Sequence, residues 1–203
     1  MKIICVGRNY IAHAHELNNK VPDEPLLFLK PETALLRKRQ AFFIPDFTNE
    51  VHYETELVIR ICKVGKHIQE KFAHTYYNEI ALGIDFTARD IQHICKTKGW
   101  PWEIAKAFDG SAAVGSFVDK KKWDNLLNID FELKKNDDTV QKGNSKDMIF
   151  SCDQLISYIS RFFTLKIGDI IFTGTPAGVG PVKRNDRLNG YLAGHHNLSV
   201  LVK

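Results

Sequence analysis

The chain has 203 residues, of which 44% are hydrophobic and 26% are charged. These proportions are typical of a globular protein, and the length allows one domain, residues 1–203, to bury a core without disulfides or structural metals. The formal net charge is only +4. This charge suits small anionic ligands but provides no basic groove, so we expect no nucleic-acid partner.

The cysteines and the first residues bear on the cellular compartment. Cys5, Cys62, Cys95 and Cys152 form no Cys-x-x-Cys pair, which favours buried free thiols over a zinc site or a disulfide framework. Residues 1–7 are too short for a secretory signal, and no stretch has the length and hydropathy of a membrane span. We therefore expect a cytoplasmic protein without a membrane partner.

The N-terminal segment predicts a strand at residues 2–6 and a helix at residues 10–17 with Asn9 as its cap. On this helix His13 and Glu16 are three residues apart and are therefore neighbours. A histidine that is oriented by a carboxylate can act as a general base. The alternative is a weak ion pair on the surface.

Residues 52–61 (HYETELVIRI) alternate as a half-buried strand does. Glu54 and Glu56 are two apart, so they project side by side from one face of this strand. Two carboxylates at this spacing repel each other unless they are solvated, share a proton or hold a cation. A solvated face is the ordinary interpretation, but a third acid, Asp85, favours a shared cation.

An apolar strand at residues 80–84 ends directly before Asp85. Thr87 and Asp90 then match a capping box in its Asp form, which would open a helix that runs to about Lys96. Asp90 is explained by this cap, whereas Asp85 is not. A carboxylate between a strand end and a helix start is well placed to bind a ligand.

Arg89 and Gln92 are three residues apart on the same predicted helix and share a face near these acids. A guanidinium beside an amide is a suitable receptor for a carboxylate and its neighbouring carbonyl. Residues 98–115 predict a long ordered loop, a feature that is often functional. Within it Lys106 lies among apolar neighbours, so its side chain either extends to water or holds a buried anion.

Strands dominate the second half of the sequence. Ser151 and Gln154 match a capping box, and an apolar stripe that includes Phe162 follows on the predicted helix. Strands outnumber helices and do not alternate with them regularly, so we expect a β-rich α+β fold, a mixed β roll or sandwich. Further strands are predicted at residues 128–135, 139–142, 170–173, 187–192 and 198–202.

The glycine-rich segment 174–180 does not have the sequence of a nucleotide-binding loop. It lacks the Gly-Lys-Ser/Thr ending of a P-loop, and its glycines do not follow the dinucleotide-binding order. Its backbone N–H groups and Thr175 can still bind a small anion.

The three acids Glu54, Glu56 and Asp85 offer only carboxylate oxygens. Such hard ligands suit Mg²⁺, followed by Mn²⁺ and Ca²⁺, with water or substrate oxygens completing the coordination. Residue types and spacing therefore predict a divalent-cation site.

Six ordered blocks cover nearly the whole chain: GRNYIAHAHE at 7–16, PLLFLKP at 25–31, HYETEL at 52–57, GIDFTARDIQ at 83–92, KGWPWEIAKAFD at 98–109 and GDIIFTGTPAGVGPV at 168–182. Together they resemble the fumarylacetoacetate hydrolase family. The similarity is greatest to its short branch of acylpyruvate hydrolases and oxaloacetate decarboxylases, which start at the catalytic domain. The resemblance implies a mixed β-sandwich roll and a divalent-metal enzyme that is usually a homodimer.

The resemblance also implies roles for individual residues. Residues 7–18 would form a mobile lid, whose His13–Glu16 dyad activates water. The acids of the HYETEL and GIDFTARD blocks bind Mg²⁺ in the family; here they are Glu54, Glu56 and Asp85. The positions that contact a 2-oxo acid substrate in the family correspond to Arg89, Gln92, Lys106 and Thr175.

Some positions depart from the family pattern. Ala113 and Ser116 replace common prolines, and Asn78-Glu79 replaces a more usual Gly-Tyr. Because none of these is an expected ligand, the differences bear on loop shape and substrate fit.

These residues predict a reaction that passes through a pyruvate enolate. His13 would deprotonate a water that attacks an acylpyruvate, and the metal and Lys106 would stabilise the enolate that leaves. Oxaloacetate decarboxylation reaches the same enolate without the water.

Two alternatives stay open: an isomerase or tautomerase of 2-oxo diacids, such as 2-hydroxyhepta-2,4-diene-1,7-dioate or oxaloacetate, and a non-enzymatic metal-dependent binding protein. The His13–Glu16 pair favours an enzyme, because a binding protein needs no base.

Overall fold

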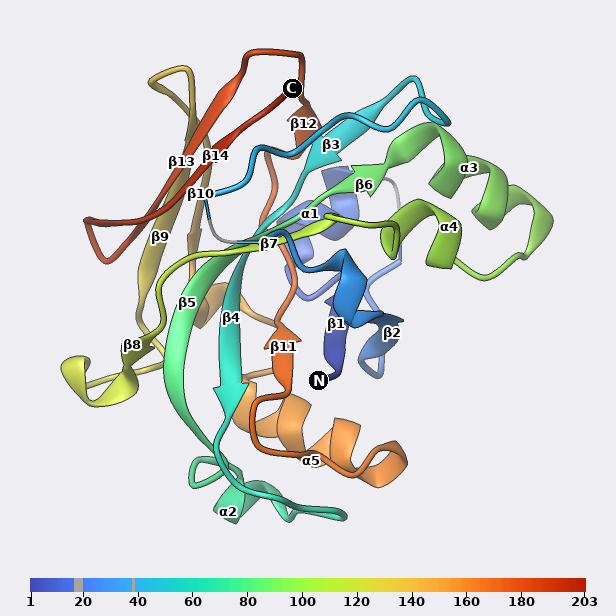
Figure 1. Cartoon of the computed structure of the whole chain (residues 1–203). Helices are drawn as coiled ribbons and strands as arrows, with labels where there is room; N and C mark the ends of the chain where they lie inside the picture. The colour runs from blue at the N-terminus through green and yellow to red at the C-terminus, as the bar shows by residue number, and fades with distance from the viewer. Residues whose placement is uncertain (17–19, 38) are drawn as a thin grey trace.

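The computed structural model describes residues 1–16, 20–37 and 39–203, and its centre is a large mixed sheet (Figure 1). The pair β1–β11 is parallel and the other pairs are antiparallel, so the mixed, β-rich fold class is confirmed. In spatial order the strands are β2 (Leu26–Lys30), β1 (Ile3–Gly7), β11 (Ile170–Phe172), β4 (Thr55–Ile61), β5 (Tyr77–Asp85) and β7 (Ala112–Val114), with β8 (Val118–Asp119) also paired to β5.

Two smaller sheets complete the β structure. A four-stranded sheet consists of β10 (Asp138–Asn144), β9 (Asp130–Lys135), β13 (Arg187–Leu192) and β14 (His195–Leu201), and a three-stranded sheet of β12 (Gly180–Pro181), β3 (Val51–Tyr53) and β6 (Thr87–Ala88). The four-stranded sheet packs on the large one, because β13 and β14 both contact β5.

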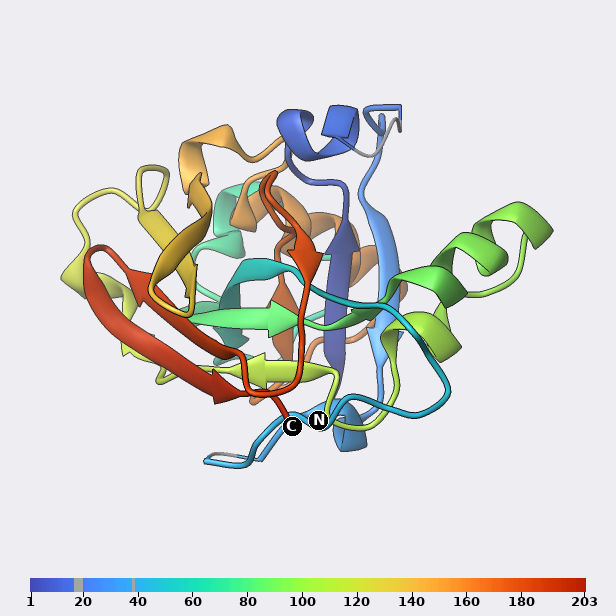
Figure 2. The same ribbon diagram turned by 90° about the horizontal axis from the view of Figure 1, so that it is seen from above.

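The helices are short and lie around the sheets. They are α1 (Ile11–Glu16), α2 (Glu70–Ala73), α3 (Arg89–Lys98), α4 (Glu103–Lys106) and α5 (Cys152–Phe162), with 3₁₀ turns at Glu32–Ala34, Lys120–Lys122 and Ser145–Asp147. Figures 1 and 2 both place the pair α3–α4 on the side of the molecule opposite the four-stranded sheet. Among the described residues, no helix has the length and hydropathy needed to cross a membrane.

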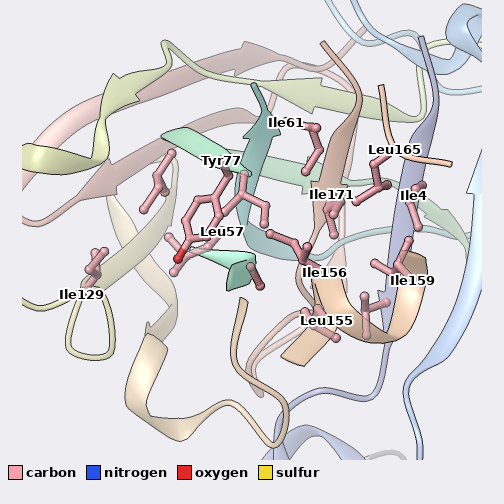
Figure 3. Packing of buried hydrophobic residues seen from close by; sticks show 14 of the residues in the cluster. Ile4, Leu57, Ile61, Tyr77, Ile129, Leu155, Ile156, Ile159, Leu165 and Ile171 are labelled. Atoms are coloured by element: carbon pink, nitrogen blue, oxygen red, sulfur yellow. The ribbon is translucent and has the colours of Figure 1, made fainter. Parts of the chain in front are cut away.

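Helix α5 covers one face of the large sheet. The predicted capping box at its start is confirmed: Ser151 Oγ accepts from the Gln154 N–H at 3.3 Å, and Gln154 Oε1 accepts from the Ser151 N–H at 2.9 Å. Phe162 was predicted to belong to the buried stripe, but it is 52% exposed and packs edge-on against Tyr158 at the end of the helix. The residues that pack in this core include Ile4, Leu57, Leu155, Ile156, Ile159 and Ile171 (Figure 3).

The predicted cap at Asn9 is wrong. Its Nδ2 donates to the carbonyl oxygens of Phe150, at 2.9 Å, and Thr173, at 2.7 Å, and its Oδ1 accepts from the Phe150 N–H. Asn9 therefore joins the start of α1 to two distant segments. Of the predicted lid segment 7–18, residues 11–16 form α1, whereas residues 17 and 18 lie outside the described residues.

The capping box predicted at Thr87 and Asp90 is also wrong. Helix α3 begins at Arg89 without a side-chain cap. The Asp90 carboxylate instead accepts from the Thr48 hydroxyl at 2.5 Å and the Asn49 N–H at 2.9 Å. A contact across the fold replaces the local one.

Two other segments differ from expectation in ways that matter for the site. The predicted strand 52–61 is interrupted at Glu54, between β3 and β4, where the Glu54 carbonyl accepts from the Asp85 N–H at 2.8 Å. The predicted loop 98–115 contains α4 and β7. The interruption and the short helix α4 bring Glu54, Asp85 and Lys106 together.

Candidate active site

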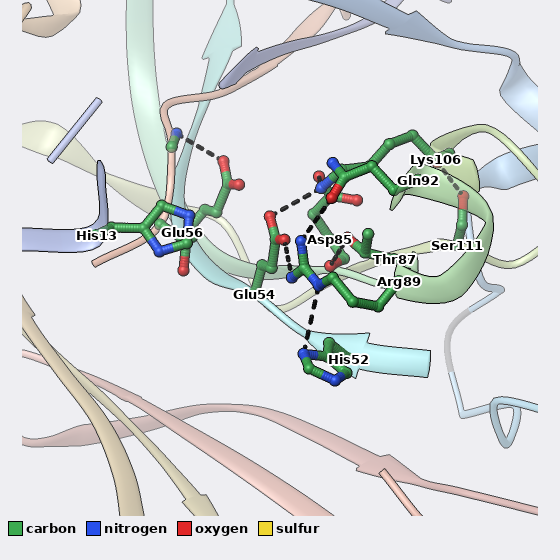
Figure 4. Close-up of polar contacts among 12 residues, drawn as sticks. His13, His52, Glu54, Glu56, Asp85, Thr87, Arg89, Gln92, Lys106 and Ser111 are labelled. Atoms are coloured by element: carbon green, nitrogen blue, oxygen red, sulfur yellow. Dashed lines mark hydrogen bonds and ion pairs between the residues drawn. The ribbon is translucent and has the colours of Figure 1, made fainter. Parts of the chain in front are cut away.

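Three buried carboxylates lie at the end of the large sheet where β4 begins and β5 ends. Glu54 directly precedes β4, Glu56 lies in it, and Asp85 ends the neighbouring antiparallel strand β5. The three residues are 5%, 2% and 0% exposed, and one oxygen from each lies within 4.8 Å of the others (Figure 4). The structure thus brings together the acids that the sequence suggested, and it excludes a solvated face.

Cationic side chains surround two of these acids. Lys106, which is 3% exposed, places its Nζ 2.8 Å from both Glu54 Oε2 and Asp85 Oδ2. Arg89 Nη2 donates to Glu54 Oε1 at 2.5 Å. Burial alone would raise the pKa of Glu54, but Lys106 and Arg89 hold that pKa well below its usual range. Lys106 therefore binds buried anions and does not extend to water.

A second buried lysine, Lys30, contacts Asp85 and was missed by the sequence analysis. Its Nζ lies 2.8 Å from Asp85 Oδ1, and the side chain is 0% exposed. The ammonium also donates to Ser111 Oγ at 2.9 Å and to the Lys106 carbonyl. A lysine at the end of an apolar strand between two prolines was the available signal, because a buried ammonium requires an anionic partner.

Glu56 differs from the other two acids because no cationic side chain among the described residues pairs with it. Its Oε2 accepts from the Gly174 N–H at 2.6 Å. Burial, Asp85 and Glu54 together raise the pKa of Glu56 well above its usual range. Gly174 has φ +99°, and a Cβ there would lie 2.6 Å from the Asn9 Cβ, so only glycine fits this close approach.

The donor set fits a hard divalent cation. Asp85 Oδ1 is buried, and among the described residues its partner is the Lys30 ammonium at 2.8 Å. The repulsion among the acids that raises the pKa of Glu56 is what a cation would relieve. Three carboxylates without nitrogen or sulfur ligands suit Mg²⁺ and Mn²⁺ alike.

The predicted pair of His13 and Glu16 forms on α1. His13 Nδ1 lies 3.0 Å from Glu16 Oε2, and the His13 side chain is 5% exposed. The histidine is buried whereas Glu16 is exposed, so the pair is not a fully solvated surface ion pair. The other carboxylate oxygen of Glu16 accepts from the Gly178 N–H at 2.9 Å. His13 Nε2 is thus left for the cavity that His13 lines together with Glu54 and Glu56.

Arg89 makes contacts that orient other polar groups. Its Nη1 donates to Gln92 Oε1 at 2.7 Å, which leaves the Gln92 amide N–H groups for a ligand. Its Nε donates to His52 Nδ1 at 3.4 Å. Burial, followed by the Arg89 charge, lowers the pKa of His52. Arg89 has five N–H groups and uses three here, so two are left for a substrate.

Thr175 lines the cavity, but its hydroxyl group is engaged by the protein. The hydroxyl donates to the Thr55 carbonyl and accepts from Gln141 Nε2, each at 2.9 Å. The side chain therefore holds the loop 174–180 against β4. Of the anion-binding groups predicted in that loop, the Gly174 N–H binds a carboxylate of the protein itself, that of Glu56.

The cavity among these residues is small, and three residues that line it were not predicted from the sequence. Its volume is about 30 Å³, enough to hold roughly one or two water molecules. Arg8, Lys96 and Trp102 also line it. Arg8 and Trp102 lie in loops, where no periodic pattern applies. Lys96 lies near the end of α3, four residues beyond Gln92, and the helical pattern did not single it out.

Comparisons with known proteins give a consistent result. The sequence model of the fumarylacetoacetate hydrolase C-terminal family matches residues 2–200. The human oxaloacetate tautomerase FAHD1, a mitochondrial protein, is 44% identical over 196 residues, which cover 97% of this chain and 87% of that protein. The mitochondrial oxaloacetate decarboxylase of Dictyostelium discoideum is 44% identical over 183 residues, 90% of this chain and 84% of that protein.

A solved structure supports the same assignment of the fold. Fumarylpyruvate hydrolase from Pseudomonas aeruginosa, in complex with Mn²⁺ and pyruvate, superimposes with a TM-score of 0.93 at 38% identity. The match covers 100% of this chain and 89% of that one.

Proposed function

Because the chain belongs to the fumarylacetoacetate hydrolase family of enzymes, we propose that it acts on small 2-oxo acids through their enolates, with the tautomerisation of oxaloacetate as its main reaction. The observation that carries this proposal is the buried cluster of Glu54, Glu56, Asp85 and Lys106, which shares a cavity with His13. The names of the relatives favour oxaloacetate as substrate. A non-enzymatic binding protein has no support among them.

Glu54, Glu56 and Asp85 would hold the divalent cation, Mg²⁺ or Mn²⁺ by their chemistry. When bound, the cation polarises the 2-oxo group and stabilises negative charge on its oxygen. The neighbouring Pseudomonas structure contains Mn²⁺ and pyruvate, and a pyruvate unit is what oxaloacetate and acylpyruvates share.

The protein's own groups would move the proton and orient the substrate. His13 Nε2 accepts a proton from C3 of oxaloacetate and returns it to the enolate oxygen to give the enol. The bond of His13 Nδ1 to Glu16 at 3.0 Å fixes the orientation of the imidazole. The Lys106 ammonium adds positive charge where the enolate forms. The Gln92 amide, held by Arg89, donates to the substrate carboxylate.

Hydrolysis of acylpyruvates is the second candidate function. A buried histidine that is paired with a carboxylate can deprotonate water as well as carbon. The water would attack the distal carbonyl, and the same enolate would leave. Decarboxylation of oxaloacetate needs no base to deprotonate a water, and it yields that enolate together with carbon dioxide.

The test measures three reactions of the purified protein, with Mg²⁺ and with EDTA: oxaloacetate tautomerisation, oxaloacetate decarboxylation and acylpyruvate hydrolysis. We expect EDTA to abolish all three. His13→Ala should lower tautomerisation and hydrolysis by about 10²- to 10⁴-fold and affect decarboxylation less. His15→Ala is the matched control, because His15 is exposed on the same helix. Full turnover in EDTA, or an unchanged His13→Ala variant, would contradict the proposal.

We also propose that the chain is one catalytic domain that forms a homodimer in the cytoplasm and binds no nucleic acid. Exposed apolar side chains such as Phe47 and Ile104, which are 52% and 58% exposed, favour self-association. Light scattering of the purified protein should give roughly twice the chain mass of 23.2 kDa. A monomer mass at micromolar concentration would count against the dimer.

A further inference from the structure

Two cationic side chains in the cavity are not explained by the three acids. Arg8 and Lys96 both line it and are half-buried. Neither forms an ion pair with any carboxylate in residues 1–16, 20–37 and 39–203. A cavity lined by cations that no carboxylate of the protein pairs with is suited to an anionic ligand.

The position of Lys96 gives the direction in which such a ligand would extend. Arg89, Gln92 and Lys96 are spaced i, i+3 and i+7 on α3 and therefore share one face of the helix. Arg89 contacts Glu54, so this stripe leads outward from the acids, and Lys96 lies about 10 Å further along the helix axis. The Lys96 ammonium lies 5.7 Å from the centre of the Trp102 ring, which limits its access to water.

Arg8 approaches from the junction between β1 and α1. It has φ +60°, a backbone conformation that is unfavourable for a residue with a side chain and that is found preferentially at functional sites. Burial lowers the pKa of Arg8. Burial, followed by repulsion from Arg8 and Arg89, lowers the pKa of Lys96. The Arg8 and Lys96 charges therefore repel each other, and the attraction of Glu54 for Lys96 offsets only part of this repulsion.

The charge of the whole cavity favours an anionic ligand. Four cationic side chains and three carboxylates line it, and a bound dication would add two positive charges, which leaves an excess of three. A 2-oxo acid that ends in a methyl group would place an apolar end beside Arg8 and Lys96. A 2-oxo acid that ends in a second carboxylate would instead offer both cations a negative charge to contact.

We propose that Arg8 and Lys96 form a distal carboxylate subsite, which makes 2-oxo dicarboxylates the preferred substrate class of this site over acylpyruvates with uncharged ends. This inference rests on the proposed function, because the proximal carboxylate and the 2-oxo group must occupy the site of the three acids. The subsite determines specificity and takes no part in proton transfer.

The test compares two unreactive 2-oxo acids of equal length that differ only at the distal end. These are 2-oxoglutarate, which ends in a carboxylate, and 2-oxopentanoate, which ends in a methyl group. Binding of each is measured by calorimetry in the presence of Mg²⁺. We expect the wild-type protein to bind 2-oxoglutarate about 10- to 100-fold more tightly, as a charge-assisted hydrogen bond would give.

The variants are Lys96→Met, which keeps the apolar part of the side chain on Trp102, and Arg8→Gln. In each the preference for 2-oxoglutarate should fall by about tenfold or more. Lys98→Met is the matched control, because Lys98 is exposed on the same helix and lies over Trp100; it removes the same charge and should keep the preference.

The outcomes separate this inference from the function on which it rests. Wild-type protein that binds both acids equally, or Lys96→Met and Arg8→Gln variants that both keep the full preference, would overturn the subsite. The same is true if Lys98→Met reduces the preference as much as Lys96→Met, because a general electrostatic effect would then explain it. Wild-type protein that binds neither acid would contradict the proposed function itself.

Discussion

Glu54 and Glu56 are two residues apart in the sequence but have opposite electrostatic surroundings. Glu54 contacts Arg89 and Lys106, and these cations lower its pKa. Glu56 accepts a hydrogen bond from the Gly174 N–H, and neighbouring acids raise its pKa. The Glu54 charge therefore stabilises the cations around it, whereas the Glu56 charge has no cationic side chain paired with it among the described residues and would be compensated by a bound cation.

This difference predicts different effects of two isosteric substitutions. Glu56→Gln should weaken Mg²⁺ binding by about 100-fold or more, since even a residue behind a metal ligand contributes about 10- to 100-fold. In EDTA it should leave the free energy of unfolding unchanged or raise it, because a repulsion is removed. Glu54→Gln should weaken Mg²⁺ binding and also destabilise the fold in EDTA by about 3–5 kcal/mol, as breaking a buried ion pair does.

Calorimetric Mg²⁺ titrations and urea unfolding in EDTA measure the two quantities. Equal destabilisation by both substitutions would show that the two acids do not differ in this way.

Local spacing was enough to identify some of these residues and not others. The two-residue spacing of Glu54 and Glu56 and the three-residue spacing of His13 and Glu16 are properties of the chain itself, so the sequence could predict both pairs. Lys30 contacts Asp85 only because β2, β1, β11, β4 and β5 are neighbours in one sheet. No local pattern contains that order.

At the scale of elements, one carboxylate joins helix α1 to the glycine-rich loop 174–180. Glu16 Oε2 lies 3.0 Å from His13 Nδ1, and Glu16 Oε1 accepts from the Gly178 N–H at 2.9 Å. His13 lines the cavity of the three acids together with Glu54 and Glu56. The Glu16–Gly178 contact therefore fixes helix α1, and with it the His13 imidazole, relative to that cavity.

Gly178→Ala should disrupt this contact. Gly178 has φ +99°, and a Cβ there would lie 2.5 Å from the Val140 carbonyl oxygen, so the loop must shift. We expect turnover of 2-oxo acids to fall by about tenfold or more, because misplacing a catalytic group by an ångström has effects of up to about 100-fold.

Gly194→Ala is the control for the Gly178 substitution. Gly194 also has a positive φ, +78°, but a Cβ there meets no atom within 4 Å, in the turn between β13 and β14. Both substitutions should cost about 1 kcal/mol or more in stability from backbone strain. Steady-state kinetics and thermal unfolding separate the two effects. Equal loss of turnover in both variants would refute a specific role for the Glu16–Gly178 contact.

Asp169 holds the paired strands β1 and β11 together at one end. Its carboxylate accepts from the Lys2 and Lys166 N–H groups, each at 2.8 Å, and Lys2 Nζ lies 2.5 Å away. Burial alone would raise the pKa of Asp169, but these contacts lower that pKa. A lowered pKa in the folded state stabilises the protein above the ordinary carboxyl pKa of about 3.9, and the stabilisation is lost as the pH falls through the folded-state value.

Asp169→Asn should accordingly cost about 1–3 kcal/mol of unfolding free energy at pH 7. The difference from wild type should shrink as the pH is lowered below about 4. Urea unfolding at a series of pH values measures it, with Asp46→Asn as an exposed control. A difference that is independent of pH would mean that the charge of Asp169 contributes nothing.

The predicted helix starts show where reasoning on single elements succeeds. The capping box of Ser151 and Gln154 is correct because both partners lie within one helical turn. The similar pattern at Thr87 and Asp90 fails because Thr48, forty-two residues away, takes the Asp90 carboxylate. A local motif predicts a cap only where no distant partner competes for the same side chain.

For the molecule as a whole, the site exists because separate segments meet at one end of the sheet. Glu54 and Asp85 come from antiparallel neighbours, Lys106 from a short helix, and His13 from the N-terminal helix. Periodicity and composition predicted a β-rich mixed fold, but not which strand ends coincide. The resemblance of the six sequence blocks supplied that information, because a family resemblance already implies the arrangement of its members.

A cation that joins the start of β4 to the end of β5 should stabilise the entire fold. The unfolded chain does not hold the three acids together, so Mg²⁺ should bind the native state only. At a concentration one hundred times its dissociation constant it should add about 2.7 kcal/mol to the unfolding free energy. For a chain of this length that corresponds to a rise in melting temperature of about 5–10 °C.

Thermal unfolding in EDTA and in a Mg²⁺ series measures this effect. The shift should follow the logarithm of the Mg²⁺ concentration above the dissociation constant. Glu56→Gln should reduce it at the same concentrations from about 2.7 to about 0.4 kcal/mol or less, whereas Asp124→Asn, which removes an exposed acid, should keep it in full. A shift of the same size in Glu56→Gln would assign the stabilisation to another cation site and leave the three buried acids without the role that the proposed chemistry requires.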